Sequence, residues 1–263
     1  MRALHTAATG MKAQELNVQV ISNNIANMRT TGYKRQRVQF QDLLYEHVSR
    51  IGTQTSAQGN RLPVGIDLGG GVKTVGTPRL MTQGTLNQTG GTLDLAIRGD
   101  GLFKIQLPDG TYAYTRDGSF QMDAQGRIVT SQGNVVQPAI TIPQNSTGLT
   151  VNAQGQVAVT PQGATQSTVL GQLTLTRFIN QAGLLSVGDN MFTETAASGA
   201  PQDGLPNTDG AGDLQQGQLE QANVEAVSEI SDLIAAQRAY EMNSKVITAA
   251  DQMLSATSNL MRG

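Results

Sequence analysis

The sequence predicts an α+β protein in which long N- and C-terminal helices pair as a coiled-coil-like inner domain, with a central, mainly antiparallel β domain and an extended linking arm. All eight prolines lie within residues 51–218, and of the 30 glycines only Gly10, Gly32 and Gly263 lie outside that range. Apolar residues at both ends of the chain recur at alternating steps of three and four, which is the spacing of an amphipathic helix. Helix-permissive ends therefore flank a turn-rich middle.

The N-terminal helix of the inner domain is expected over residues 1–32. Its seam is formed by Leu4, Ala7, Met11, Gln14, Val18, Ile21, Ile25 and Met28. Asn23, Asn24 and Asn27 are unusual near the end of such a helix, because buried amides without partners cost free energy. We expect these amides to find partners across subunits or in water, and Asn27 to bond backbone groups where the helix ends. Gly32 supplies the backbone freedom for the exit.

An extended connecting arm is expected over residues 33–67, and it includes the stretch 46–65. The central β-rich domain is expected over residues 68–216. Short strand candidates alternate there with Pro-Asp-Gly, Asp-Gly and Ala-Gln-Gly turns, as in residues 102–133, and this alternation is typical of antiparallel hairpins.

The C-terminal helix of the inner domain is expected over residues 217–263. Its seam contains Leu219, Ala222, Ala226, Glu229, Leu233, Ala236, Tyr240, Asn243, Ile247, Ala250, Leu254, Thr257 and Met261. Further apolar residues widen this stripe, namely Val227, Ile230, Ile234, Val246, Met253 and Leu260. A stripe of this width predicts neighbours on more than one side of the helix.

The two ends of the chain carry opposite charge. Residues 1–50 hold seven Lys/Arg and three Asp/Glu, whereas residues 219–263 hold three and six. This balance favours pairing of the two helices, although solvated helix faces explain it equally well and exposed ion pairs add little energy. An isolated helix is marginal in water, and the glycine-rich middle offers few large apolar residues to cover two helices. We therefore expect packing between subunits through Leu4, Met11, Val18, Ile21, Ile25, Leu233, Tyr240, Ile247 and Leu254.

Composition and motifs point away from an enzyme and from a nucleic-acid partner. The net charge is −2 and cysteine is absent, so neither nucleic acid nor an acidic membrane surface is expected as a partner. No stretch has the apolar core of a secretory signal or the roughly 18 apolar residues of a spanning helix, so neither a cleaved signal peptide nor membrane insertion is expected. His5 and His47 stand apart from any nucleophile or metal motif. We expect no catalytic site, no metal and no cofactor.

Three stretches of the sequence resemble a known family. Residues 21–46 resemble the N-terminal signature of bacterial flagellar rod and hook proteins, residues 223–254 resemble their shared C-terminal segment, and residues 96–133 resemble their β domain. The core of the N-terminal signature consists of Ala26, Asn27, Thr30, Gly32, Tyr33 and Lys34. The three stretches follow one another in the order found in the family.

Within this family, subunits of the distal rod are the best match, and a proximal rod or hook-type axial protein is the alternative. The resemblance implies subunits that stack helically into a rigid hollow drive shaft of the basal body, spanning the periplasm. It also implies export through the flagellar type III apparatus without a cleaved signal peptide. Proximal rod proteins, the hook protein and the surrounding ring proteins are the implied partners, and no cofactor is implied.

The stretch 46–65 resembles an extra segment associated with the distal rod. Its residues Arg50, Arg61, Leu62 and Pro63 are expected to brace the inner helices against a neighbouring subunit's β domain and so to limit sliding. A rival from a different class is a secreted β-rich module that binds glycan. Glycan sites use aromatic platforms, and this chain has five Tyr, five Phe and no Trp.

Overall fold

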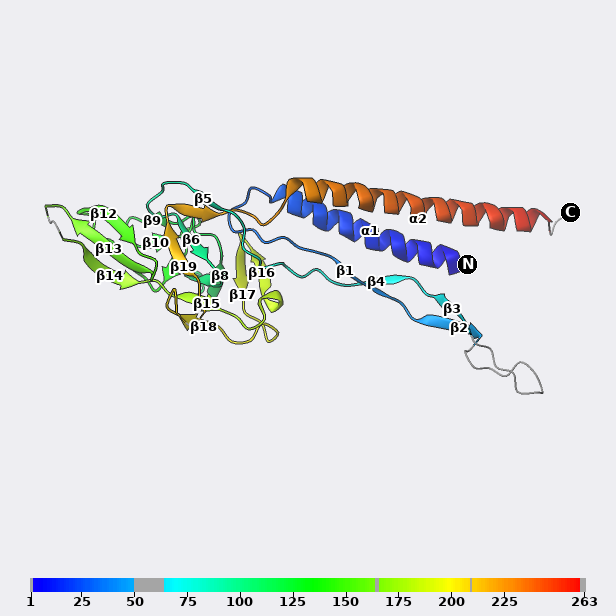
Figure 1. Cartoon of the computed structure of the whole chain (residues 1–263), viewed down its shortest axis with the longest axis horizontal. Coiled ribbons are helices and arrows are strands. Elements are labelled where there is room, and N and C mark those ends of the chain that lie inside the picture. Colours follow the sequence, from blue (N-terminus) through cyan, green and yellow to red (C-terminus); the bar gives the residue numbers. More distant parts are fainter. Residues whose placement is uncertain (1, 50–63, 164–165, 209, 261–263) are drawn as a thin grey trace. The chain divides into compact units, whose positions relative to one another are not determined.

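The computed structural model describes residues 2–49, 64–163, 166–208 and 210–260, and it confirms the α+β class (Figure 1). The expected bracing residues Arg50, Arg61, Leu62 and Pro63 lie outside the described residues. The chain divides into two compact units. We call them the helical unit, which comprises Met1–Ile25, Gln36–Pro78 and Glu225–Gly263, and the β unit, which comprises Ala26–Arg35 and Arg79–Val224.

The helical unit contains two long helices, α1 (Arg2–Ala26) and α2 (Ala226–Leu260). It also contains four short strands, which are β1 (Gln39–Asp42), β2 (Tyr45–Ser49), β3 (Ile66–Gly69) and β4 (Val72–Gly76). β1 pairs with β4 and β2 pairs with β3, both antiparallel. The expected extended arm is therefore a two-stranded ribbon, because residues 66–76 return alongside it.

Helices α1 and α2 lie side by side (Figure 1). Their contact uses small residues, since Ala7, Ala13, Ala236 and Ala250 are buried. At Gly10 a β-carbon would lie 3.0 Å from the side-chain nitrogen of Asn243, so a larger residue there requires the Asn243 side chain to shift.

A polar contact joins the two helices at the other end of their pairing. The side-chain nitrogen of Asn24 donates to Oε2 of Glu229 over 3.1 Å, and both side chains are buried. Because Gly10 faces Asn243 whereas Asn24 faces Glu229, the two helices run in opposite directions.

The residues expected to pack between subunits differ in their exposure in this single chain. Ile21 is buried, and five others are half-buried, namely Leu4, Met11, Val18, Ile25 and Leu233. Ile247 is also half-buried, whereas Tyr240 and Leu254 remain 43% and 44% exposed. Within one copy, the seam residues of α1 and α2 are therefore buried only in part.

Both helices are shorter than the sequence predicts. α1 ends at Ala26, six residues before the expected end, because Asn24 bonds the backbone of Gln36 through both ends of its amide, at 2.9 and 3.0 Å. These two bonds draw the chain back into a tight loop after the helix. The amide of Asn24 thus finds its partners within the chain, which corrects the expectation that it bonds across subunits or to water.

α2 begins at Ala226 instead of residue 217. Residues Gln218–Glu220 form strand β20, which pairs with β5 (Leu86–Gln88). The side chain of Asn223 accepts a hydrogen bond from the backbone N–H of Arg35 at 2.7 Å and donates to the carbonyl of Leu80 at 2.8 Å. These side-chain bonds to distant backbone compete with helix formation over this segment.

The β unit is built from antiparallel strands. A nine-stranded sheet follows the order β16-β17-β8-β7-β11-β10-β9, and β15 pairs with both β7 and β18 beside it. Its strands are β7 (Leu102–Gln106), β8 (Tyr112–Thr115), β9 (Gln121–Met122), β10 (Ile128–Val129), β11 (Val135–Gln137), β15 (Leu175–Arg177), β16 (Leu185–Gly188), β17 (Met191–Thr193) and β18 (Gln202–Gly204).

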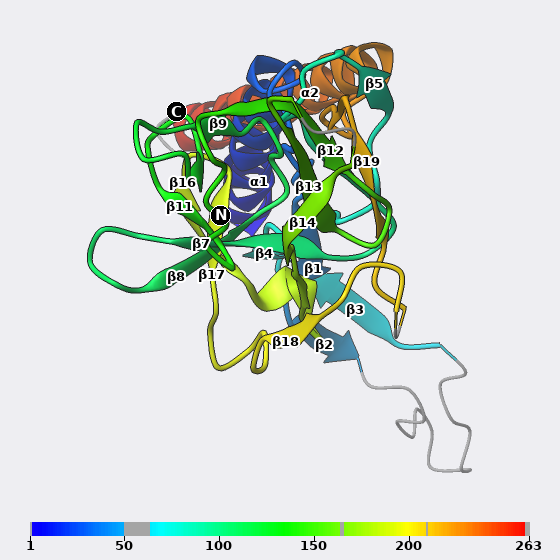
Figure 2. The same cartoon turned by 90° about the vertical axis from the view of Figure 1, so that its left-hand side faces the viewer.

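Besides the β5–β20 pair, two smaller sheets and a short 3-10 helix belong to the β unit. Strands β12 (Ser146–Val151), β13 (Gln156–Pro161) and β14 (Thr168–Gln172) lie side by side (Figure 2). Strand β6 (Leu95–Arg98) pairs with β19 (Asp213–Gln216), and η1 spans Gln181–Gly183. The core between these sheets contains Phe103, which meets Phe120 edge to face with ring centres 5.0 Å apart.

Candidate functional site

The segment Ala26–Arg35, which we call the signature segment, belongs to the β unit. The backbone N–H of Gly32 donates to the carbonyl of Glu220 at 2.8 Å. The backbone N–H of Leu80 donates to the carbonyl of Arg35 at 2.8 Å. The signature segment is thus hydrogen-bonded to both ends of the stretch Arg79–Val224: to Leu80 near its start and to Glu220 near its end.

A buried cluster of charges lies beside these backbone bonds. Glu220 is fully buried, and one of its carboxylate oxygens accepts a hydrogen bond from the ammonium of Lys34 at 2.7 Å and from the backbone N–H of Gly84 at 2.8 Å. Its other oxygen accepts from Nε of Arg116. We call Lys34, Arg116 and Glu220 the Glu220 cluster.

Further donors of the Glu220 cluster bond backbone carbonyls. Lys34 donates to the carbonyl of Thr82 at 2.8 Å. Arg116 donates to the carbonyls of Ile97, Gly99 and Gly101 at 3.0, 2.6 and 2.6 Å. A buried ion group is tolerated only when its donors and acceptors are satisfied in this way.

Burial and neighbouring charges shift the pKa values of Lys34 and Glu220. Burial lowers the pKa of the Lys34 ammonium, and the neighbouring Glu220 only partly opposes that shift. Burial by itself raises the pKa of the Glu220 carboxyl, but the charges of Arg116 and Lys34 outweigh it and hold that pKa below its usual value. Glu220 therefore stays ionised at neutral pH.

The middle of the signature segment lies closely against strand β8 and the turn after it. Gly32 has φ +67°, and a β-carbon there would lie 2.7 Å from the backbone nitrogen of Asp117. Tyr33 is buried, and the guanidinium of Arg79 lies 5.9 Å from its ring centre and 5.5 Å from that of Phe192. Gly32, Tyr33 and Lys34 are thus three consecutive buried residues of the signature segment.

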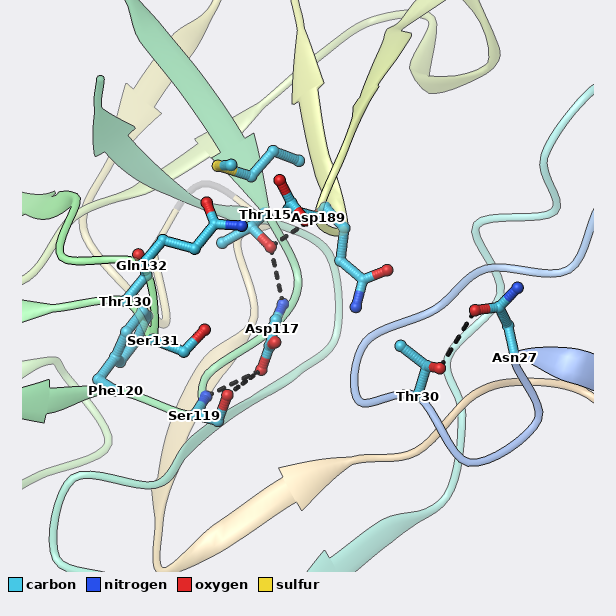
Figure 3. Close-up of a pocket in the computed structure, with 12 residues that line it drawn as sticks. Asn27, Thr30, Thr115, Asp117, Ser119, Phe120, Thr130, Ser131, Gln132 and Asp189 are labelled. Atoms are coloured by element: carbon cyan, nitrogen blue, oxygen red, sulfur yellow. Dashed lines mark hydrogen bonds between the residues drawn. The ribbon is translucent and has the colours of Figure 1, made fainter. Parts of the chain in front are cut away.

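Other signature residues line a polar cleft of about 380 Å³ in the β unit (Figure 3). Asn27 and Thr30 lie on the loop after α1, and the hydroxyl of Thr30 donates to the amide oxygen of Asn27 at 3.2 Å. Across the cleft, Asp117 accepts two hydrogen bonds from Ser119, from its backbone N–H at 2.9 Å and its hydroxyl at 2.7 Å. Ala26 is exposed at the start of this loop.

The polar groups around the cleft bond one another locally. The cleft is lined mainly by hydroxyl and amide groups, and the bonds of Asp117 to Ser119 close a local turn. Within the described parts of the chain, no three His, Cys, Asp or Glu side chains gather where they could hold a metal ion. Neither described helix is both long enough and apolar enough to span a bilayer.

A second feature of functional interest is the exposed side of α2. Six apolar side chains there are between 46% and 73% exposed, namely Val227, Ile230, Ile234, Met242, Val246 and Met253. At about 100° per residue, Val227 and Ile234 lie roughly opposite the buried Glu229 and Ala236, whereas Val246 and Met253 flank the buried Ala250. We call this set the outer stripe of α2. That neighbours on more than one side of the helix cover it stays a prediction.

Sequence reasoning missed half of the buried site. Gly32, Tyr33 and Lys34 belong to the signature that the sequence singles out, whereas Arg116 and Glu220 were not candidates. The one signal pointing to Glu220 was the opposite charge of the chain ends, because Lys34 lies in the basic end and Glu220 in the acidic end. A buried Arg116 is indistinguishable in the sequence from a solvated one.

Comparison with known proteins identifies the family. Three family models match parts of the chain. The model described as "Flagella basal body rod protein" matches residues 4–34, and the model described as "Flagellar hook protein FlgE/F/G D1 domain" matches residues 96–159. The model described as "Flagellar basal body rod FlgEFG protein C-terminal" matches residues 215–260. A protein of Caulobacter vibrioides named flagellar basal-body rod protein FlgG is 56% identical over 260 residues, 99% of each chain. The chain belongs to the flagellar basal-body rod protein family. The resemblance of the sequence to this family is therefore confirmed.

Other relatives with the same name are similar along the whole length of this rod-family chain. The protein of Agrobacterium fabrum is 49% identical over 262 residues, 100% of both chains. That of Buchnera aphidicola subsp. Acyrthosiphon pisum is 47% identical over 258 residues, 98% of this chain and 99% of the relative. The matched N- and C-terminal regions include Lys34 and Glu220, so both partners of the buried ion pair lie within family segments.

Replacing Gly32 tests whether close packing fixes the signature segment. We expect Gly32→Ala to lower the free energy of unfolding of the β unit by about 2 kcal/mol or more, because the positive φ and the contact with Asp117 both oppose a side chain. Gly133→Ala is the matched control, since Gly133 has φ +85° but open space where the β-carbon would lie. Urea denaturation followed by circular dichroism measures both, and equal losses would mean that the contact contributes nothing.

Replacing Glu220 tests the buried cluster. Glu220→Gln leaves Lys34 and Arg116 as two buried cations, so we expect a loss of about 3–5 kcal/mol at neutral pH. Because the folded-state pKa of Glu220 is lowered, its stabilisation is complete above the unfolded pKa of about 4.3 and is lost as the pH falls through the folded-state pKa. The difference between wild type and variant therefore shrinks in acid.

Denaturation of wild type and Glu220→Gln between about pH 7 and pH 3 measures this difference. Glu194→Gln, which changes an exposed carboxylate of the same unit, is the control and should stay within about 0.5 kcal/mol of wild type. An unchanged stability of Glu220→Gln at neutral pH contradicts the role assigned to the cluster.

Proposed function

We propose that this chain is a structural subunit of the bacterial flagellar distal rod. Copies assemble helically into a rigid hollow drive shaft that transmits motor torque to the hook and lets exported subunits pass. The observation that carries the proposal is the outer stripe of α2, which leaves a long helix apolar on two sides in a chain of the rod family. One side meets α1, and the other requires a second copy.

The energetics of α2 favour assembly. Each large apolar side chain contributes roughly 1.5–3 kcal/mol when it is fully buried, and six such side chains of the outer stripe are at least 46% exposed in the single chain. A helix that is apolar on two sides is stable in water only when both sides are covered. In the shaft, α1 and α2 form a coiled-coil-like inner layer, and Leu4, Met11, Val18, Ile21, Ile25, Leu233, Tyr240, Ile247 and Leu254 pack within and between copies.

The ribbon of the helical unit supports the bracing role of residues 46–65. Tyr45, Val48, Val64 and Ile66 are between 53% and 70% exposed on or beside strands β2 and β3. A two-stranded ribbon alone is marginally stable, so exposed apolar side chains on it favour contact with another copy. Arg50, Arg61, Leu62 and Pro63 then belong to an arm that cross-braces neighbouring copies and stiffens the shaft.

The partners follow from the rod assignment. The subunit passes the flagellar type III export apparatus without a cleaved signal peptide and takes its place in the basal body, across the periplasm. Proximal rod proteins and the hook protein are its axial neighbours, and the ring proteins surround it. A proximal rod or hook-type role within the same family is the alternative.

A glycan-binding module is not favoured by the cleft of the β unit. Of the described residues that line it, Phe120 is the single aromatic, and it is only 5% exposed. It therefore offers little surface for a sugar ring to stack on.

Imaging concentrated protein tests the proposed function. We expect the purified chain to form hollow tubes above a threshold concentration and to remain monomeric below it. Amide hydrogen exchange should show α1 and α2 exchanging rapidly in the monomer and slowly in the tube, because the uncovered apolar faces are covered only on assembly. Discrete particles at every concentration, with both helices already protected, contradict the proposal.

Deletion of residues 46–65 tests the bracing arm. We expect tubes of the deletion variant to bend more readily, because neighbouring copies lose their cross-links, while the inner helices still pack. The persistence length measured from electron micrographs gives the comparison. Tubes as stiff as those of wild type rule out the bracing role.

A further inference from the structure

The last strands of the β unit pair with its first strands. β6 pairs with β19 and β5 pairs with β20, both antiparallel. Among the described strands, neither β5 nor β6 has another partner. We call residues 213–223, which contain β19 and β20, the closing stretch. It acts over a long distance in the sequence, since Gly84 bonds Glu220, which lies 136 positions later.

The closing stretch also completes the apolar core of the β unit. Leu95 and Ile97 of β6 are fully buried, and Leu214 of β19 is buried in the same hydrophobic cluster. At the end of the stretch, the side chain of Asn223 donates to the carbonyl of Leu80 at 2.8 Å. A chain that lacks the closing stretch therefore leaves β6 without its strand partner and part of the core uncovered.

The charges of the Glu220 cluster are made in a fixed order. Lys34 precedes Glu220 by 186 positions in the chain, and Arg116 precedes it by 104. Synthesis starts at the N-terminus and adds about 5–20 residues per second, so 104 positions take about 5–20 s. Both cations are therefore present well before the carboxylate that neutralises them.

Strand pairing in the larger sheets does not by itself delay folding. All strands of the nine-stranded sheet lie between residues 102 and 204, and those of the three-stranded sheet lie between residues 146 and 172. Antiparallel β domains fold in milliseconds to seconds, so these strands have time to pair before Glu220 is made. The charges oppose this closure, because Lys34 and Arg116 are 2% and 5% exposed and buried cations without an anion are strongly destabilising.

We propose that the closing stretch is a folding latch. The β unit stays open while the chain is being made, and it closes only when Glu220 reaches Lys34 and Arg116. By then α2 is the only described element still to follow. The proposal rests on the proposed function for its use, since a chain that is still open can enter an export channel too narrow for a folded β unit.

Nascent chains arrested on the ribosome give the first test. Synthesis is halted where residues 1–212, residues 1–224 or the whole chain have left the ribosome, and each complex is treated briefly with a protease. We expect the β unit of the first chain to be cut like an unfolded chain, and that of the second to be cut at least about tenfold more slowly. Protection already at residues 1–212, or protection that appears only for the whole chain, overturns the latch.

Refolding of the full chain tests the role of the charges. We expect Glu220→Gln to slow refolding from urea by about tenfold or more, because closure then buries two cations without their anion. Glu225→Gln is the matched control, since Glu225 is an exposed acid just after the closing stretch, and its rate should stay within about twofold of wild type. Stopped-flow tyrosine fluorescence measures both variants. A Glu220→Gln effect confined to the unfolding rate overturns the proposal, because the cluster then forms only after closure.

A second substitution shows whether uncompensated charge causes the delay. Lys34→Met combined with Glu220→Gln leaves one buried cation without an anion in place of two. The double variant should therefore refold at least about threefold faster than Glu220→Gln alone. The same comparison applies if Glu220→Gln does not refold at all, because the double variant should then regain refolding. A double variant that is no faster than Glu220→Gln overturns charge as the basis of the latch.

The outcomes separate the latch from the proposed function. Early protection of the nascent chain, or unchanged refolding of Glu220→Gln, overturns the latch while tube formation by the wild-type protein still supports the rod subunit. A wild-type protein that forms no tubes at any concentration overturns the proposed function. The order in which the β unit closes is then still measured by the nascent chains and by refolding.

Discussion

The structure depends on one buried anion. The carboxylate of Glu220 is fully buried and is shared by the ammonium of Lys34, the guanidinium of Arg116 and the backbone N–H of Gly84. A buried charge without partners is strongly destabilising, so these groups must be in place together. They come from the start, the middle and the end of the chain. The β unit therefore closes only when the segment after α1 and the segment before α2 have both entered it.

In the helical unit, a buried amide takes the place that the buried carboxylate has in the β unit. Asn24 is buried and uses its amide to hold the backbone of Gln36 and the carboxylate of Glu229. This arrangement ends α1 and joins it to the first turns of α2. The carboxylate of Glu220 and the amide of Asn24 thus find their partners within the chain, whereas the apolar outer stripe stays exposed. The exposed groups of α2 that lack a packing partner in one copy are thus apolar side chains, and covering them favours assembly with other copies.

Local patterns in the sequence were reliable where they depended on neighbouring residues. The seam of α2 is buried at Glu229, Ala236 and Ala250 as the three-and-four spacing predicts, because helical periodicity is a property of the chain itself. Gly32 has the positive φ that its glycine allows, although it lies in a turn six residues after the end of α1. The helix ends were less reliable, because side-chain bonds from Asn24 and Asn223 to distant backbone set them.

The sequence by itself determined the α+β class, the two apolar helices, the family signature and the opposite charges of the chain ends. Only the tertiary structure decided that residues 66–76 pair with the arm as a ribbon and that Arg116 completes the site around Glu220. The physical reason is that periodicity and turn chemistry act over a few residues. The partner of a buried charge is chosen by whichever distant segment the fold brings within hydrogen-bond distance.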